Sequence, residues 1–171
     1  QGVSSAASDV YKRQVYSHFT DKETLFCAAV KARCEEQLPE LFFEFPAGAT
    51  VHNVLLNIAR GFSQLLNSSE SVDLHRLMTS LGAQDPQLAK IFYEAGPQRL
   101  LAEMECLLGK MDQSGQLRIE SPKLAADQFF SLLKGGANFR LLIGCGEPET
   151  EAQQEQHARA TVEMFLRAYR P

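Results

Sequence analysis

Hydrophobic residues recur every three or four positions along most of this chain, the spacing that places them on one face of an α-helix. The alternation of hydrophobic and polar residues that marks a half-buried strand does not persist in any stretch. The pattern therefore predicts an all-α bundle of about seven to eight helices joined by short loops. We expect helices over residues 21–38, 50–67, 71–82, 86–95, 97–113 and 122–143, and a last helix that follows a polar loop at 144–156 and ends at Pro171.

Short local signals mark several ends of these helices. Thr20 and Glu23 have the spacing of a capping box, in which both side chains accept hydrogen bonds from backbone N–H groups at the helix start. Pro86 follows Asp85, a pair that favours a new helix at this point. Pro97 removes a helical N–H group, so we expect a break before it.

Glycines mark two further places. Gly115 follows a helical stretch and predicts a helix end, because glycine readily adopts the left-handed conformation of a C-cap. Gly135 and Gly136 lie inside an apolar helical stretch, where each lowers helix propensity by about 1 kcal/mol relative to alanine. We interpret this pair as a place where another helix approaches closely.

Composition narrows the class of protein. The chain has 171 residues, 44% of them hydrophobic, which is enough for one domain with its own core. A net charge of -4 excludes a surface that is basic throughout, so any contact with DNA is local. No apolar run approaches the roughly 20 residues of a membrane span and no signal peptide is visible, so we expect a cytoplasmic protein without a membrane partner. We expect reduced, buried thiols at Cys27, Cys34, Cys106 and Cys145, since no two of these have CxxC spacing.

Motifs of catalysis and of metal binding are absent from the sequence. It contains no P-loop, no GxGxxG after a strand, no GxSxG and no HExxH. The four histidines are far apart in sequence, at positions 18, 52, 75 and 157. We therefore expect a protein that is not an enzyme and that holds neither a metal nor another cofactor.

The stretch VYSHFTDKETLF, residues 15–26, carries the most specific motif of the chain. It resembles the end of the helix-turn-helix in TetR-family transcriptional regulators, whose pattern reads L-Y-x-H-F, a polar pair, then K-E-x-L-F. The matching positions are Val15, Tyr16, His18, Phe19, Lys22, Glu23, Leu25 and Phe26.

The resemblance implies a DNA contact at this point of the chain. Tyr16, Ser17 and His18 would lie at the end of the recognition helix and touch phosphates or groove edges. Lys22 would reach the DNA backbone from the start of the next helix, where free N–H groups also attract phosphate. The alternative is that these side chains only pack a helix end.

The remainder of the chain resembles the C-terminal ligand-binding and dimerisation domain of the same family. The resemblance thus implies a TetR-like homodimer that represses transcription from operator DNA and releases the DNA when a small apolar effector binds. Residues 15–38 would be the remnant of the DNA-binding domain with its connecting helix, and residues 39–171 the ligand-binding and dimerisation domain. Two alternatives stay open: a helical ligand-binding or dimerisation module without a DNA function, and a small helical enzyme.

Residues 1–14 depart from the family pattern. Gly2-Val3-Ser4 matches the turn of the motif, but more residues separate Ser4 from Tyr16 than the family has between these points. The stretch VSSAASDVYKRQ also resembles translated sequencing-adapter sequence. We therefore interpret residues 1–14 as non-native or disordered, the helix-turn-helix as incomplete, and DNA binding by this chain as impaired; a genuine insertion is the alternative.

Two sets of residues follow from the resemblance together with the apolar pattern. The effector pocket would lie among the middle helices, lined by Phe62, His75, Met78, Phe92, Tyr93, Met104 and Phe129, although such a stripe can equally be plain core. The dimer interface would be built by the last two helices, through Leu132, Phe139, Val162, Phe165 and Tyr169.

Overall fold

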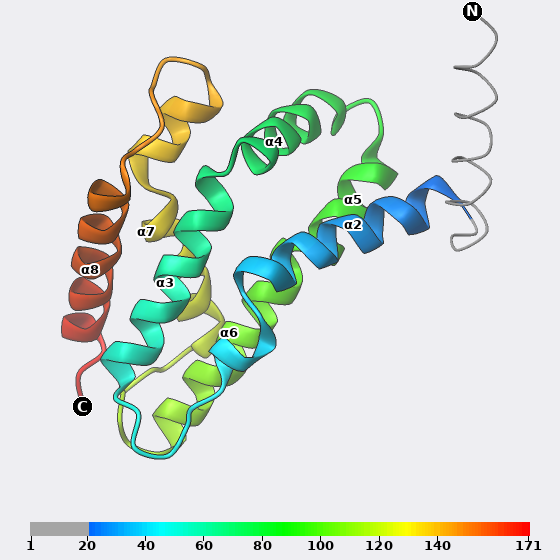
Figure 1. Ribbon diagram of the computed structural model, residues 1–171. Coiled ribbons are helices and arrows are strands. Elements are labelled where there is room, and N and C mark those ends of the chain that lie inside the picture. Colours follow the sequence, from blue (N-terminus) through cyan, green and yellow to red (C-terminus); the bar gives the residue numbers. More distant parts are fainter. Residues whose placement is uncertain (1–20) are drawn as a thin grey trace, which may run out of the picture.

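The computed structural model describes residues 21–171, which fold into seven α-helices and one short 3-10 helix without any strand in that part of the chain (Figure 1). This confirms the all-α prediction. The elements are α2 (Lys22–Gln37), η1 (Glu40–Phe43), α3 (Val51–Asn67), α4 (Ser69–Leu81), α5 (Pro86–Ala95), α6 (Pro97–Gln113), α7 (Pro122–Leu142) and α8 (Glu151–Ala168).

Local signals set most helix ends where the sequence predicts them. The side chain of Asp85 accepts a hydrogen bond from the backbone N–H of Leu88 at 3.0 Å, and Pro86 opens α5. Pro97 begins α6 after a break at Gly96. Gly115, two residues after the last residue of α6, has a φ of +72°. These three features confirm the predictions, because each depends on the backbone conformation of only one or two residues.

Three boundaries differ from the prediction. The N-cap of α2 is Asp21, whose Oδ1 accepts from the Thr24 N–H at 2.7 Å, so the capping box expected from Thr20 is wrong about the capping residue. The stretch between the helices expected over 21–38 and 50–67 contains a further short helix, η1. α8 begins at Glu151, inside the predicted polar loop, because Thr150 and Gln153 form a capping box there.

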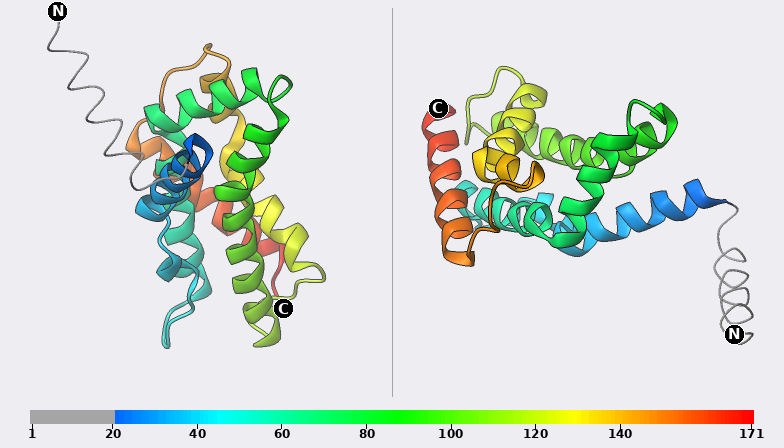
Figure 2. Two further views of the ribbon diagram at one scale, coloured as in Figure 1. Left: turned by 90° about the vertical axis from the view of Figure 1, so that its right-hand side faces the viewer. Right: turned by 90° about the horizontal axis from the view of Figure 1, so that it is seen from above.

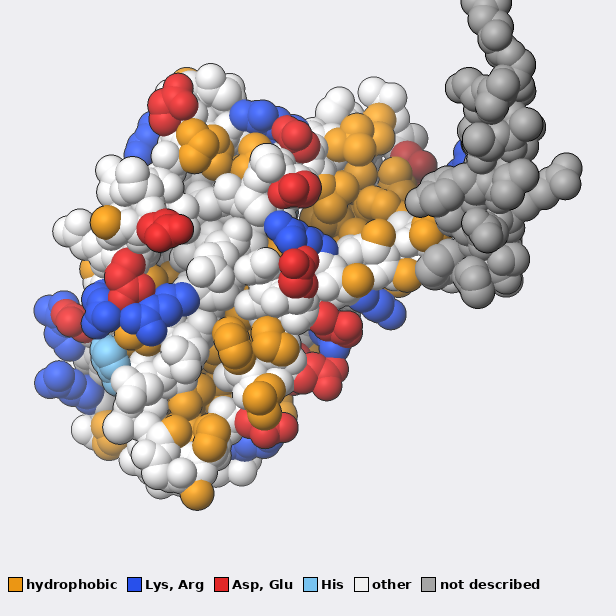
Figure 3. Space-filling model, viewed as in Figure 1, with side chains coloured by type: hydrophobic (Ala, Val, Ile, Leu, Met, Phe, Trp, Pro, Cys, Tyr) orange, Lys and Arg blue, Asp and Glu red, His pale blue; other side chains and the backbone are white. Residues whose placement is uncertain are grey.

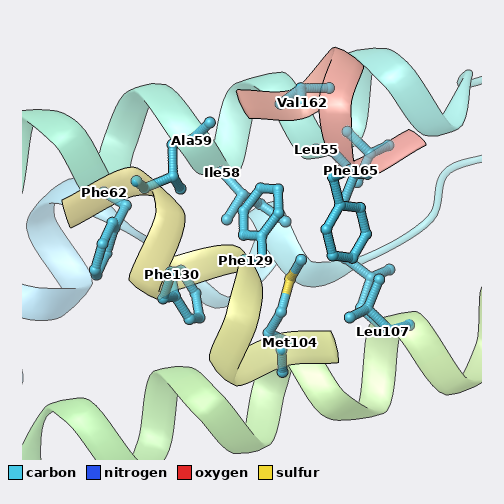
Figure 4. Packing of buried hydrophobic residues seen from close by; sticks show 14 of the residues in the cluster. Leu55, Ile58, Ala59, Phe62, Met104, Leu107, Phe129, Phe130, Val162 and Phe165 are labelled. Carbon is cyan, nitrogen blue, oxygen red and sulfur yellow. The ribbon is translucent and has the colours of Figure 1, made fainter. Parts of the chain in front are cut away.

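The core is built around α3, which packs against α2, α4, α7 and α8 (Figure 1). Leu55, Ile58 and Ala59 on α3 are completely buried. Phe129 of α7 is also completely buried and lies edge-on to Phe165 of α8, with ring centroids 5.1 Å apart. Figure 4 shows the side chains of these helices converging with those of α6, so the core is shared by four helices.

α2 runs alongside α5 and extends away from the body of the bundle toward its first residue (Figure 2). Its last turn is held firmly: Leu38 is buried, and a side chain at Gly61 on α3 would collide with the Gln37 carbonyl oxygen. The far end is more open, since Asp21, Lys22 and Glu23 are exposed. α2 is therefore fixed at its C-terminal end and projects at the other.

α7 is kinked at Gly135, which has φ +56° and ψ -177°. The break leaves backbone carbonyls of the preceding turn without their helical partners. Nε2 of His157 on α8 lies 3.1 Å from the Leu132 carbonyl oxygen and 3.2 Å from that of Leu133, so the imidazole N–H donates to this pair. A Cβ at position 135 would lie 3.1 Å from the same nitrogen, which agrees with the close helix approach inferred from the two glycines.

Within residues 21–171, every helix is too short or too polar to cross a bilayer.

Candidate ligand site

A cavity of about 100 Å³ lies between α2, α3, α4, α5, α6 and α7. Its wall is predominantly apolar because each helix turns hydrophobic positions spaced by three or four residues toward it. Hydrophobic side chains also gather at the surface on the side of α2 and α5 (Figure 3). The apolar lining consists of Val30, Cys34, Phe62, Leu65, Leu66, Leu74, Phe92, Pro97, Leu100, Leu101 and Phe130.

Aromatic rings form one side of the cavity. Phe62 of α3 and Phe130 of α7 are both buried, and their ring centroids are 4.5 Å apart. Phe92 of α5 is partly buried and faces the ring of His75 on α4. The cavity can therefore hold a flat apolar group by ring contacts and dispersion.

His75 is the histidine of this wall. Its Nδ1 lies 2.7 Å from the carbonyl oxygen of Ser71, one turn earlier on α4. Its ring stands edge-on to Phe92 at a centroid distance of 5.5 Å and an interplanar angle of 90°. The imidazole is thus held on two sides while it faces the cavity.

α2 contributes a charged side chain and a thiol. Arg33 pairs with Glu36 at 2.7 Å and with Glu70 at 3.6 Å, while its Nε is buried without a hydrogen-bond partner. Burial raises the pKa of the Cys34 thiol, and this effect outweighs the opposing influence of Arg99. A neutral thiol at this position adds apolar surface to the wall rather than a nucleophile.

The α7 side of the cavity is polar. Asp127, Ser131 and Lys134 follow one another at intervals of four and three residues, so they lie on one face of the helix, and all three are exposed. They form a hydrophilic rim beside the aromatic wall. Among residues 21–171, no cluster of three or more histidine, cysteine or carboxylate side chains is placed to hold a metal ion.

The structure divides the seven predicted pocket residues. Phe62, His75 and Phe92 line the cavity. Met104 and Phe129 do not, because they are completely buried in the core between α3, α6, α7 and α8. Met78 is buried outside the cavity wall, and Tyr93 is 49% exposed and lines a different hollow of the surface.

Other lining residues were not predicted, in particular those of α2 and α7. Val30, Arg33 and Cys34 have the i, i+3, i+4 spacing of a buried stripe, and this spacing is the signal that could have found them. Phe130 is adjacent to Phe129 in sequence, and only the orientation of α7 decides which ring faces the cavity.

Most of the predicted DNA contacts lie outside the described residues. This applies to Tyr16, Ser17 and His18, and also to the interpretation of residues 1–14. Lys22 is described: it is exposed and opens α2.

The predicted interface residues fall into two groups. Leu132 and Phe139 on α7 are exposed, by 39% and 62%. Val162 and Phe165 are buried in the core of the chain itself, so they have no surface to offer a second subunit. Tyr169 packs on Phe165, and its hydroxyl donates to Gln128 Oε1 at 2.7 Å.

Comparisons with known proteins point to one family. A family model described as the C-terminal domain of AefR-like transcriptional repressors matches residues 53–171. The crystal structure of a TetR-family transcriptional regulator from Mesorhizobium loti MAFF303099 is 31% identical; the match covers 94% of this chain and 81% of that one, with a TM-score of 0.77. No curated protein matches the chain significantly.

Two further solved structures have the same fold. The flavonoid-responsive regulator FrrA is 28% identical over 94% of this chain and 81% of its own, with a TM-score of 0.71. A TetR-family regulator from Pseudomonas syringae pv. tomato str. DC3000 is 24% identical over 92% of this chain and 79% of its own, with a TM-score of 0.68, and supports the fold alone.

Proposed function

Because this chain belongs to the TetR family of transcriptional regulators, we propose that it is a repressor whose affinity for operator DNA is lowered by a small apolar effector. The effector occupies the cavity between α2 and α7. The match to the AefR-like repressor domain supports the repressor role, and the flavonoid response in the name of FrrA supports an apolar, aromatic class of effector. The protein acts in the cytoplasm as a homodimer.

One observation carries this proposal: α2 forms part of the cavity wall. Val30 and Cys34 face the cavity, and Lys22 opens the same helix at its other end. The motif residues assigned to DNA, Tyr16, Ser17 and His18, lie four to six positions before Lys22 in the sequence. An effector that binds better to one position of α2 than to another shifts the population toward that position.

DNA binding requires two copies of the chain. A dimer presents two recognition helices to successive major grooves, about one helical turn apart, and so reads a palindrome. We propose that the dimer forms through the outer faces of α7 and α8. Leu132 and Phe139 are large apolar side chains exposed there, and Met164, which is also exposed, takes the place of the buried Val162 and Phe165 in the proposed interface.

A gel shift tests the proposed function. A chain with the complete helix-turn-helix of the family should shift DNA from the region upstream of its gene, and the shift should weaken steeply as salt rises. Lys22→Ala should weaken binding to specific and nonspecific DNA alike and reduce the salt dependence, because the lysine is assigned to a phosphate. Lys90→Ala, on the exposed side of α5, is the matched control. A chain that gives no sequence-selective shift contradicts the repressor proposal.

A further inference from the structure

His75 lines the cavity, and its contacts set the hydrogen-bonding role of its second ring nitrogen, Nε2. The other ring nitrogen, Nδ1, lies 2.7 Å from the Ser71 carbonyl oxygen. A carbonyl oxygen only accepts, so Nδ1 carries the proton. In the neutral ring Nε2 is then an acceptor with a free lone pair.

No group within residues 21–171 donates a hydrogen bond to this Nε2. The ring is nevertheless held in place, because Phe92 stands edge-on to it at 5.5 Å. An acceptor whose orientation is already set costs little entropy when a ligand binds. A ligand that donates one hydrogen bond therefore gains affinity at this point of the wall.

The rest of the cavity favours a small aromatic body. The rings of Phe62 on α3 and Phe130 on α7 are in contact. Leu100 and Leu101 of α6 complete the apolar lining. The volume, about 100 Å³, is of the order that accepts one ring, since an apolar cavity of about 150 Å³ takes up benzene.

The charges around the cavity argue against an acid as ligand. Both Nη atoms of Arg33 are paired with carboxylates, those of Glu36 and Glu70, and its Nε is closed off. Lys134 lies at the exposed rim of the cavity, where its ammonium group stays in contact with water. A carboxylate ligand that enters the apolar part of the cavity would thus give up its hydration without gaining a cation there, which is costly.

We infer that the effector is a small phenol, whose hydroxyl donates to Nε2 of His75 while its ring packs against Phe62, Phe92 and Phe130. The inference deepens the proposed function, on which it rests, by naming the chemical class of the effector. It also assigns His75 as the residue that distinguishes a phenol from its methyl ether.

Calorimetric titration of the whole chain tests this with three probes: 4-ethylphenol, 4-ethylanisole and 4-ethylbenzoate. The wild-type chain should bind the phenol about tenfold more tightly than the ether, because the ether cannot donate to Nε2. His75→Phe should lose this preference and still bind the ether, which shows that the cavity is intact. His75→Gln, which keeps an acceptor, should recover part of the preference. His52→Phe makes the same substitution outside the cavity and should leave all three affinities unchanged.

The inference is overturned if the wild-type chain binds the ether or the benzoate as tightly as the phenol, or binds none of the three. It is also overturned if His75→Phe weakens the phenol and the ether equally, since His75 would then only support the wall. These titrations contain no DNA. Phenol-selective binding without DNA release would contradict the proposed function and leave the assignment of the cavity standing.

Discussion

Nε2 of His157 on α8 lies 3.1 Å from the carbonyl oxygen of Leu132 on α7. The same nitrogen reaches the Leu133 carbonyl at 3.2 Å, so one side chain of the last helix supplies the donor that the kink in α7 removes. Unpaired backbone carbonyls away from water are costly, and we expect this partly buried contact to stabilise the break in α7 at Gly135.

Replacing His157 should therefore destabilise the fold. We expect His157→Phe to lower the free energy of unfolding by about 1 kcal/mol, because a partly buried carbonyl group loses its hydrogen-bond donor. Urea denaturation followed by circular dichroism measures the change. His157→Gln should retain part of the stability, because its amide can donate to the same carbonyls. If both variants are as stable as the wild type, the contact does not support the kink.

The two neighbouring glycines should respond in opposite ways to alanine. Gly135→Ala should destabilise by about 1–3 kcal/mol, because a side chain strains a backbone at φ +56° and ψ -177°. Gly136 has ordinary helical backbone, and a Cβ there meets only the flexible Arg140 side chain at 3.3 Å. Gly136→Ala should be neutral or stabilise by up to about 1 kcal/mol. The melting temperatures of the two variants measure these effects. Equal effects at both positions would argue against a kink at Gly135.

An ion pair between α3 and α8 should make the stability of the fold depend on pH in the acidic range. Glu155 accepts hydrogen bonds from Arg60 at 2.6 and 2.8 Å and from Arg159 at 2.6 Å. The Arg60 guanidinium, more than Arg159, lowers the pKa of Glu155 from 4.5 to about 2. The folded pKa is the lower one, so the stabilisation is complete above about pH 4.5 and disappears as the pH falls toward 2.

The measurement compares melting temperatures of the wild type and Glu155→Gln between pH 7 and pH 2. The wild type should melt higher at pH 7, and the two curves should converge in acid. Glu163→Gln removes an exposed carboxylate from the same helix and serves as the control for a change of net charge. A gap of constant size across the whole range would show that the Arg60 contact does not depend on the carboxylate charge.

Charge on the outer face of the last two helices should separate the subunits. Leu132→Glu and Met164→Glu place a carboxylate on the proposed dimer surface, where burial without a partner is unfavourable. Sedimentation velocity should show a dimer for the wild type and monomers for both variants. Leu77→Glu, at a residue of α4 that is 49% exposed, should stay dimeric. Dimers in all three variants would place the interface elsewhere.

Substitutions of Phe129 and Phe92 should distinguish a residue of the core from a residue of the cavity wall. Phe129→Ala removes a completely buried ring and should cost about 3–5 kcal/mol of stability. Phe92→Ala removes a partly buried ring and should cost less, while lowering the affinity for 4-ethylphenol. Urea denaturation and calorimetry measure the two effects. A Phe129→Ala chain of nearly wild-type stability would return this residue to the group of ligand candidates.

The contrast between these two phenylalanines shows how far sequence reasoning reaches. Helix starts such as Asp85 and ends such as Gly115 depend on a few adjacent residues, so the sequence predicts them. The choice between Phe129 and Phe130 for the cavity depends on how α7 is rotated and kinked against its neighbours, which no local pattern contains. Val162, which the sequence predicts at the subunit interface, is buried in the core because of the way α8 is rotated against α3.

The capping residues give a second example. Thr20 and Asp21 are both good N-cap residue types, and in the described part of the chain the Asp21 side chain accepts from the Thr24 N–H of the first turn. Gly135 and Gly136 likewise have the same sequence signal, although only the first adopts the conformation that requires glycine. In each case the residue types restrict the answer to two neighbours, and packing chooses between them.

The last turn of α2 is held tightly against α3, so the helix can pivot about this end. The pivot point, or fulcrum, is the contact of Gln37 and Leu38 with α3 at Gly61. At a rise of 1.5 Å per residue, Val30 in the cavity wall lies about 12 Å from the fulcrum and Lys22 about 24 Å. A tilt of α2 about this point, together with the α5 helix packed along it, would move Lys22 roughly twice as far as Val30. Under the proposed function, a displacement of the order of 1 Å at the ligand would thus be doubled at Lys22, with no deformation inside the helix itself.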